Sequence, residues 1–148
     1  MQPRSSGGGN PVPAAKMAIM AGPGLQRGDH VPHVSATSVA GDTIHYADIW
    51  QQRNLVLVVL DADGAAEPYA AELLAKRAAF AARDTELIVT RDPIPGLVPH
   101  GVVVADRWGE ITHVTAAAAA SQLPGVEEIL DWVDFTRMRC PECEGEWE

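Results

Sequence analysis

The chain has 148 residues, of which 20 are acidic and 11 are basic, so its formal net charge is −9 at pH 7. This charge argues against a general binder of nucleic acid or of anionic membranes, because the summed field of the protein would repel phosphate groups. With 47% hydrophobic residues and no apolar run near the roughly 20 residues that span a bilayer, the composition predicts one globular domain.

The first 24 residues are rich in Gly, Pro, Ala and Ser and show no sustained periodicity, so we expect a flexible tail there. The segment from Lys16 to Gly22 faintly resembles a targeting start. Its apolar part is shorter than the roughly 7 to 15 residues that a signal peptide uses. We therefore expect a cytoplasmic protein.

Two loosely alternating segments between Leu25 and Tyr46 flank a glycine-containing turn at Ala40-Gly41-Asp42. This pattern is typical of a β-hairpin. A single short helical turn is expected next, over residues 47–52.

The stretch from Asn54 to Arg83 organises the chain. Leu55 to Leu60 are six consecutive apolar residues rich in β-branched side chains, which predicts a central strand buried on both faces. A tight acidic turn follows, and Glu67-Pro68 suits the first turn of a helix. That helix carries an apolar stripe of Tyr69, Ala70, Leu73, Leu74 and Phe80.

A second buried strand is predicted over residues 86–90, and a parallel crossover joins the two strands. The link over residues 91–99 contains three prolines and should be irregular. A second hairpin follows over residues 101–114, with its turn at Asp106 to Gly109. The last element is a helix over residues 123–139, whose apolar positions recur at helical spacing. The order predicts an α/β sandwich with parallel central strands and an antiparallel edge.

Several of these segments resemble the redoxins, the alkyl hydroperoxide reductase and thiol-specific antioxidant branch of the thioredoxin fold. The opening Leu25-Gln-Arg-Gly-Asp-His-Val-Pro-His, the hairpin around Gly41 and the later Gly101-Val-Val-Val-Ala-Asp-Arg-Trp-Gly-Glu-Ile carry the resemblance. It covers about residues 25–139 and implies a thioredoxin-like three-layer sandwich with peroxiredoxin-like, antioxidant oxidoreductase relatives.

The sequence departs from the redoxin pattern at two places. Redoxins place a cysteine just after the central strand, at the start of a helix that lowers its pKa, whereas residues 61–69 here contain no cysteine. Redoxins also carry a cis-proline before the late strand. Pro99 stands one residue early for that position, so we expect Pro99 and His100 to form the substrate-facing loop, with His100 in or beside the proline position.

The only two cysteines lie in Cys140-Pro-Glu-Cys143. Their spacing allows a disulfide, and it equally allows both sulfurs to bind one metal ion such as zinc. Zinc needs four ligands, so such a site requires further groups or two chains that share the metal. The surrounding glutamates would raise the pKa of the thiols, which disfavours a redox role. A third interpretation is that the two cysteines have no chemical role.

Asp61-Ala-Asp63 after an apolar strand suggests a different class, the haloacid-dehalogenase-type magnesium-dependent phosphohydrolases. Thr90 and Asp106 would supply later residues of that site, although the expected lysine is missing. The alternative is that the two aspartates form a solvated turn. Of the histidines, His30 and His33 have a spacing that could meet a metal, but surface histidines are commoner. Trp147 in the acidic tail could anchor a partner.

The sequence thus predicts three segments, a tail over 1–24, a redoxin-like domain over 25–139 and an acidic tail over 140–148. Our first hypothesis is a non-catalytic binding or assembly module, a pseudoenzyme that engages a protein partner or a second copy of the chain. The second is a thiol-disulfide oxidoreductase or thiol peroxidase that uses Cys140 and Cys143. The third is the phosphohydrolase with Asp61 and Asp63.

Overall fold

A computed structural model of the chain describes residues 24–61 and 64–138. Both predicted tails lie outside this part, apart from Gly24. The elements, in chain order, are β1 (Ser35–Thr37), β2 (Thr43–His45), η1 (Tyr46–Asp48), β3 (Asn54–Val59), α3 (Ala66–Ala75), α4 (Arg77–Ala81), β4 (Thr85–Thr90), β5 (Gly101–Ala105), β6 (Ile111–Ala116), η2 (Ala120–Gln122) and α5 (Val126–Met138).

The main sheet has the strand order β4-β3-β5-β6, and β1 pairs with β2 in a separate hairpin. β3 and β4 run parallel, whereas β5 is antiparallel to β3 and β6 is antiparallel to β5. The predicted parallel pair and antiparallel edge are therefore confirmed. In this register Val59 lies opposite both Thr90 and Gly101, so β3 and β4 end where β5 begins.

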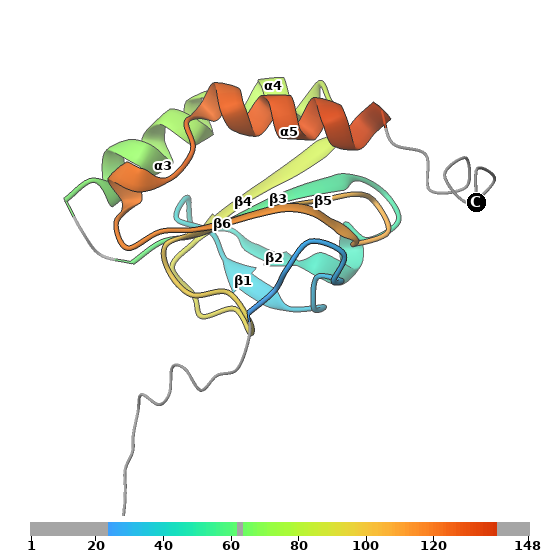
Figure 1. The fold of residues 1–148 in the computed structure, drawn as a ribbon, viewed down its shortest axis with the longest axis horizontal. Helices are drawn as coiled ribbons and strands as arrows, with labels where there is room; N and C mark the ends of the chain where they lie inside the picture. The colour runs from blue at the N-terminus through green and yellow to red at the C-terminus, as the bar shows by residue number, and fades with distance from the viewer. Residues whose placement is uncertain (1–23, 62–63, 139–148) are drawn as a thin grey trace, which may run out of the picture.

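The sheet lies between two different layers (Figure 1). The helices α3, α4 and α5 cover one face, and the β1–β2 hairpin lies against the other. All six residues of β3 are buried, as the apolar run predicts. Alternate side chains of this strand supply both cores, because successive residues of a strand point to opposite faces. Val56 and Val58 pack with the helices, and Leu55, Leu57 and Val59 pack with the hairpin.

The helices follow the predicted stripes with one interruption. The single helix that we expected after Pro68 is two helices, α3 and α4, separated at Lys76. The interruption leaves the stripe intact, since Leu73 and Phe80 are both fully buried. α5 has acids in its first turn and Arg137 in its last, which matches the helix dipole.

Candidate functional site

The end of the sheet where β3 and β4 stop and α3 begins carries several of the residues singled out from the sequence. We call it the α3 end of the sheet. Asp61 follows β3 there and is exposed. α3 begins at Ala66 after Ala65, whose side chain offers no cap, so the helix presents backbone N–H groups with only Glu67 as an acid in its first turn. No described residue from Gly64 to Ala66 has a nucleophilic side chain.

The Pro99–His100 segment lies at the same end. The peptide bond between these two residues is cis. The backbone of His100 pairs with that of Ala117 in both directions, with N···O distances of 3.1 and 2.9 Å, which extends the β5–β6 ladder by one residue. His100 is buried and Pro99 is exposed. Only Pro99 therefore presents its side chain to solvent in the predicted substrate-facing loop.

A pocket of about 490 Å³ opens beside α3 at this end, and we call it the α3 pocket. It is lined by Thr37, Ser38, Val39, Glu67, Ala70, Ala71, Leu74, Arg91 and Asp92. Val39, Ala70, Ala71 and Leu74 are the apolar residues of this lining, and Glu67, Asp92 and Arg91 are its charged ones. This pocket was not predicted from the sequence. The available signal was the pair Arg91-Asp92 directly after a strand, since ligands of α/β sheets bind beyond the carboxyl ends of the strands.

Hydrogen bonds fix the polar wall of the α3 pocket. The backbone N–H of Thr37 donates to Asp92 Oδ2 at 2.7 Å. The buried Thr90 hydroxyl donates to the carbonyl of Thr37, also at 2.7 Å, and accepts from the N–H of Asp92 at 3.0 Å. Because these bonds join the end of β1 to the end of β4, the wall is held before any ligand arrives.

The structure does not bring the proposed phosphohydrolase residues together. Asp61 and Thr90 lie at the α3 end, but Asp106 follows Ala105, which pairs with Leu55 near the start of β3. At about 3.3 Å per residue, the length of β3 separates Asp61 from Asp106 by roughly 20 Å. Asp106 instead holds its turn, because its Oδ1 accepts from the N–H groups of Trp108 and Glu110 at 2.9 and 3.0 Å. Asp63 lies outside the described residues.

The remaining candidates fall into two groups. Cys140, Cys143 and Trp147 lie outside the described residues, so the proposed disulfide or zinc site stays a prediction. His33 is exposed and packs edge-on against Tyr46 and Trp50, with ring centroids 5.3 and 5.0 Å apart. Within the described ranges, no three His, Cys, Asp or Glu side chains gather as a metal site.

Comparison with known proteins identifies the fold. No family model matches the sequence, and no curated protein matches it either. Solved structures do match. AhpC of Mycobacterium tuberculosis aligns over 80% of this chain and 97% of its own, at 15% identity and a TM-score of 0.58. The reduced 2-Cys peroxiredoxin of Plasmodium vivax aligns over 74% and 81%, at 15% identity and a TM-score of 0.56.

A cysteine-to-serine mutant of peroxiredoxin 6 from Arenicola marina aligns over 75% of this chain and 73% of its own, at 14% identity and a TM-score of 0.56. The chain therefore has the thioredoxin-like fold of these proteins, which confirms the predicted fold class. In the part of the chain that the structure describes, no helix combines the length and apolar composition needed to cross a membrane.

Proposed function

We propose that this chain is a binding or assembly module on a peroxiredoxin-like scaffold, without thiol chemistry at the α3 end of the sheet. The observation that carries the proposal is the start of α3. Where a thioredoxin fold can lower the pKa of a thiol with helix N–H groups, this chain has Gly64, Ala65 and Ala66. Its only cysteines come after α5, at positions 140 and 143.

The direction of α5 supports this proposal. α5 starts close to α3, since the Tyr69 hydroxyl donates to the carbonyl of Pro124 at 2.7 Å. Towards its other end, Asp134 accepts from Arg83 at 2.9 Å, just before β4 begins. A helix of 13 residues rises by about 20 Å. Met138, the last residue of α5, therefore lies far from the start of α3.

We assign ligand binding to the α3 pocket. Its apolar lining residues Ala70, Ala71 and Leu74 suit an apolar side chain of a peptide, and Glu67 and Arg91 suit a neighbouring charge of either sign. In this proposal the ligand is a segment of a protein partner or of a second copy of the chain. Cys140 and Cys143 then serve assembly, either by binding zinc shared with further ligands or by contact with the partner.

A peptide selection tests the binding part. Phage-displayed random peptides selected on the wild-type protein should include clones that lose binding to A71R, because the new side chain fills the pocket. A75R is the matched control, since Ala75 is exposed on α3 but does not line the pocket. Clones that bind A71R and A75R equally, or no selectable clone, would contradict the assignment.

Assays of peroxide and disulfide reduction test the absence of thiol catalysis. They use protein purified without reductant or chelator, with zinc and free thiols counted on the same sample. We expect no turnover above buffer for the wild type or for C140S and C143S, while an active peroxiredoxin serves as the positive control. Turnover that disappears in C143S would overturn the proposal in favour of a thiol-disulfide enzyme that uses Cys140 and Cys143.

A further inference from the structure

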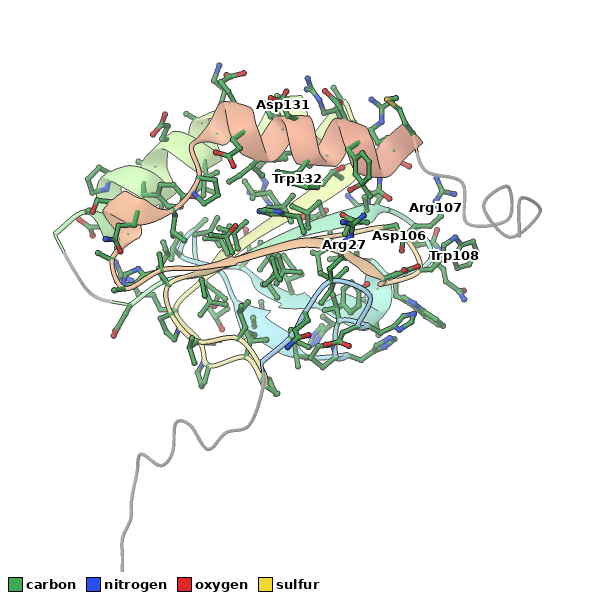
Figure 2. The ribbon with its side chains drawn as sticks, in the orientation of Figure 1. Arg27, Asp106, Arg107, Trp108, Asp131 and Trp132 are labelled. Carbon is green, nitrogen blue, oxygen red and sulfur yellow. The ribbon has the colours of Figure 1, made fainter. Side chains whose placement is uncertain are left out.

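A second hollow, of about 550 Å³, lies between α5 and the segment that precedes β1, and we call it the α5 pocket. It is lined by Arg27, Glu128, Asp131, Trp132 and Phe135. The four residues of α5 recur at i, i+3, i+4 and i+7 and so share one face of the helix. This face adjoins the one that carries Ile129, Leu130 and Val133, and Trp132 also packs against the core. Figure 2 shows Asp131 on the helix, with Trp132 and Arg27 below it.

Aromatic rings form the base of the α5 pocket. Trp132 stacks on the His113 ring of β6, with centroids 4.2 Å apart and planes inclined by 22°. Phe135 meets Trp132 edge-on at 5.6 Å and 82°. The His113 imidazole is itself tied to the Thr115 hydroxyl at 2.6 Å. The indole is therefore held by its stack on His113, and Trp132 and Phe135 give the pocket its apolar lining.

The acidic and basic residues of the α5 pocket lie on different segments of the chain. Glu128 and Asp131 are exposed on α5, and no ion pair with either carboxylate is found among residues 24–61 and 64–138. Arg27 lines the pocket from the segment before β1 and is likewise exposed. Among the described residues it forms no salt bridge with Glu128 or Asp131. Its position is set by the next residue, because the N–H of Gly28 donates to the carbonyl of Ile111 at 2.8 Å.

His113 adds little positive charge beneath the pocket at neutral pH. Burial lowers the pKa of this imidazole below its ordinary value of 6.5, and the nearby Glu128 carboxylate offsets only part of that shift. The pocket thus has two carboxylates on one side, a guanidinium on the other and a neutral aromatic base.

We propose that the α5 pocket binds a small zwitterionic molecule with a flat apolar body, the chemical class of the aromatic amino acids. The ammonium group would pair with Glu128 and Asp131. The carboxylate would take the guanidinium of Arg27, a geometry that allows two parallel hydrogen bonds. The ring would pack on Trp132 and Phe135. The volume falls within the roughly 300 to 1,000 Å³ of small-molecule sites.

This proposal is independent of the one for the α3 pocket, because the two pockets share no residue. It is tested by calorimetric titration of the full chain with three probes: L-phenylalanine, 2-phenylethylamine and 3-phenylpropionate. We expect L-phenylalanine to bind about tenfold or more tightly than the amine, because it alone can engage both walls with charge-assisted hydrogen bonds. The acid should bind least, since it meets two carboxylates.

Variants that remove one charge each test the roles of Arg27 and of the two carboxylates separately. R27A should weaken L-phenylalanine about tenfold and leave 2-phenylethylamine unchanged, whereas E128Q and D131N should weaken both. E127Q is the matched control on α5, because Glu127 is exposed and does not line the pocket. These residues are exposed, so the variants should fold, which circular dichroism checks. Equal or tighter binding of the amine, or tighter binding in R27A, would show a simple cation site and overturn the proposal, as would no binding of any probe.

Discussion

The hydroxyl groups of Thr112 in β6 and Thr136 in α5 lie 2.7 Å apart inside the domain. Both residues are buried, and each hydroxyl also meets a backbone carbonyl. Thr112 Oγ1 lies 3.2 Å from the Val104 carbonyl, and Thr136 Oγ1 lies 2.8 Å from the Trp132 carbonyl. Each hydroxyl has one proton, so one threonine donates to its carbonyl while the other donates across the pair. This pair is the polar link between the last helix and the edge hairpin, in an otherwise apolar layer.

Replacing either threonine with valine should lower the free energy of unfolding. A net hydrogen bond is worth about 1 kcal/mol, so T112V and T136V should each cost about that much. The double variant should cost less than the sum of the two, because the pair shares one bond. Urea denaturation measures all three, with T43V as the exposed control. Strict additivity would mean that the two hydroxyls do not interact.

The turn at Gly109 should tolerate no side chain. Gly109 has φ +84°, and a Cβ there would lie 3.0 Å from the Tyr46 hydroxyl. G109A combines a strained backbone with this contact and should destabilise by about 1 to 3 kcal/mol. G41A is the matched control, because Gly41 has φ +104° but no atom within 4 Å of the new Cβ. If G41A costs as much as G109A, the contact with Tyr46 contributes nothing.

Removing the Tyr46 hydroxyl should cost little. This hydroxyl is buried and has no hydrogen-bond partner among the described residues. Y46F should therefore change the free energy of unfolding by less than about 1 kcal/mol in either direction. In the G109A background the same change should recover part of the lost stability, since it removes the atom nearest the new Cβ. A large loss in Y46F alone would reveal a hydrogen bond to the hydroxyl.

The two tyrosines of the chain should resist ionisation in the folded state. Burial, followed by the charge of Asp106, raises the pKa of Tyr46 to about 12. Burial also raises the pKa of Tyr69, with smaller effects of Glu72 and Glu128. The unfolded chain loses these protons near pH 10, so stability present below about pH 10 should fall as pH rises towards 12. The ultraviolet absorbance of tyrosinate, recorded against pH, measures the ionisation of the two tyrosines. Ionisation near pH 10 without unfolding would contradict it.

His113 should make stability fall in mild acid. Because burial lowers its pKa in the folded state, the unfolded chain binds the proton first, near pH 6.5. The contribution of His113 to the free energy of unfolding is complete above pH 6.5. It is lost as the pH falls towards the pKa of His113 in the folded protein. E128Q should lower the pKa of His113 further, since the Glu128 carboxylate raises it, and E127Q should not. Imidazole proton resonances report both. If the pKa of His113 in E128Q equals that in the wild type, the Glu128 carboxylate does not act on His113.

The strands and α5 could be predicted because their patterns leave few alternatives. Six apolar residues from Leu55 to Leu60 fit a strand buried on both faces, and the glycine of the Asp106 to Gly109 segment fits the turn in which it has positive φ. The break at Lys76 could not be predicted, because the apolar stripe of Leu73 and Phe80 is the same for one helix or two.

The candidate site was less predictable because its contacts join distant segments. Asp92 accepts a hydrogen bond from the N–H of Thr37, which lies 55 positions earlier in the chain. No local sequence pattern predicts such a pair. The stack of Trp132 on His113 likewise depends on how α5 crosses β6. The separation of Asp61 from Asp106 could be predicted from the sequence. The antiparallel edge predicted from the same sequence already sends Asp106 to the far end of the sheet.

The burial of β3 on both faces also has a consequence during synthesis. Its two partner strands, β4 and β5, both follow it in the chain, and β5 ends at Ala105, 46 residues after Val59. At roughly 5 to 20 residues per second, a ribosome needs about 2 to 9 seconds to supply them. For that time an apolar strand with two open edges awaits its neighbours, which makes the nascent chain a substrate for chaperones and a risk for aggregation.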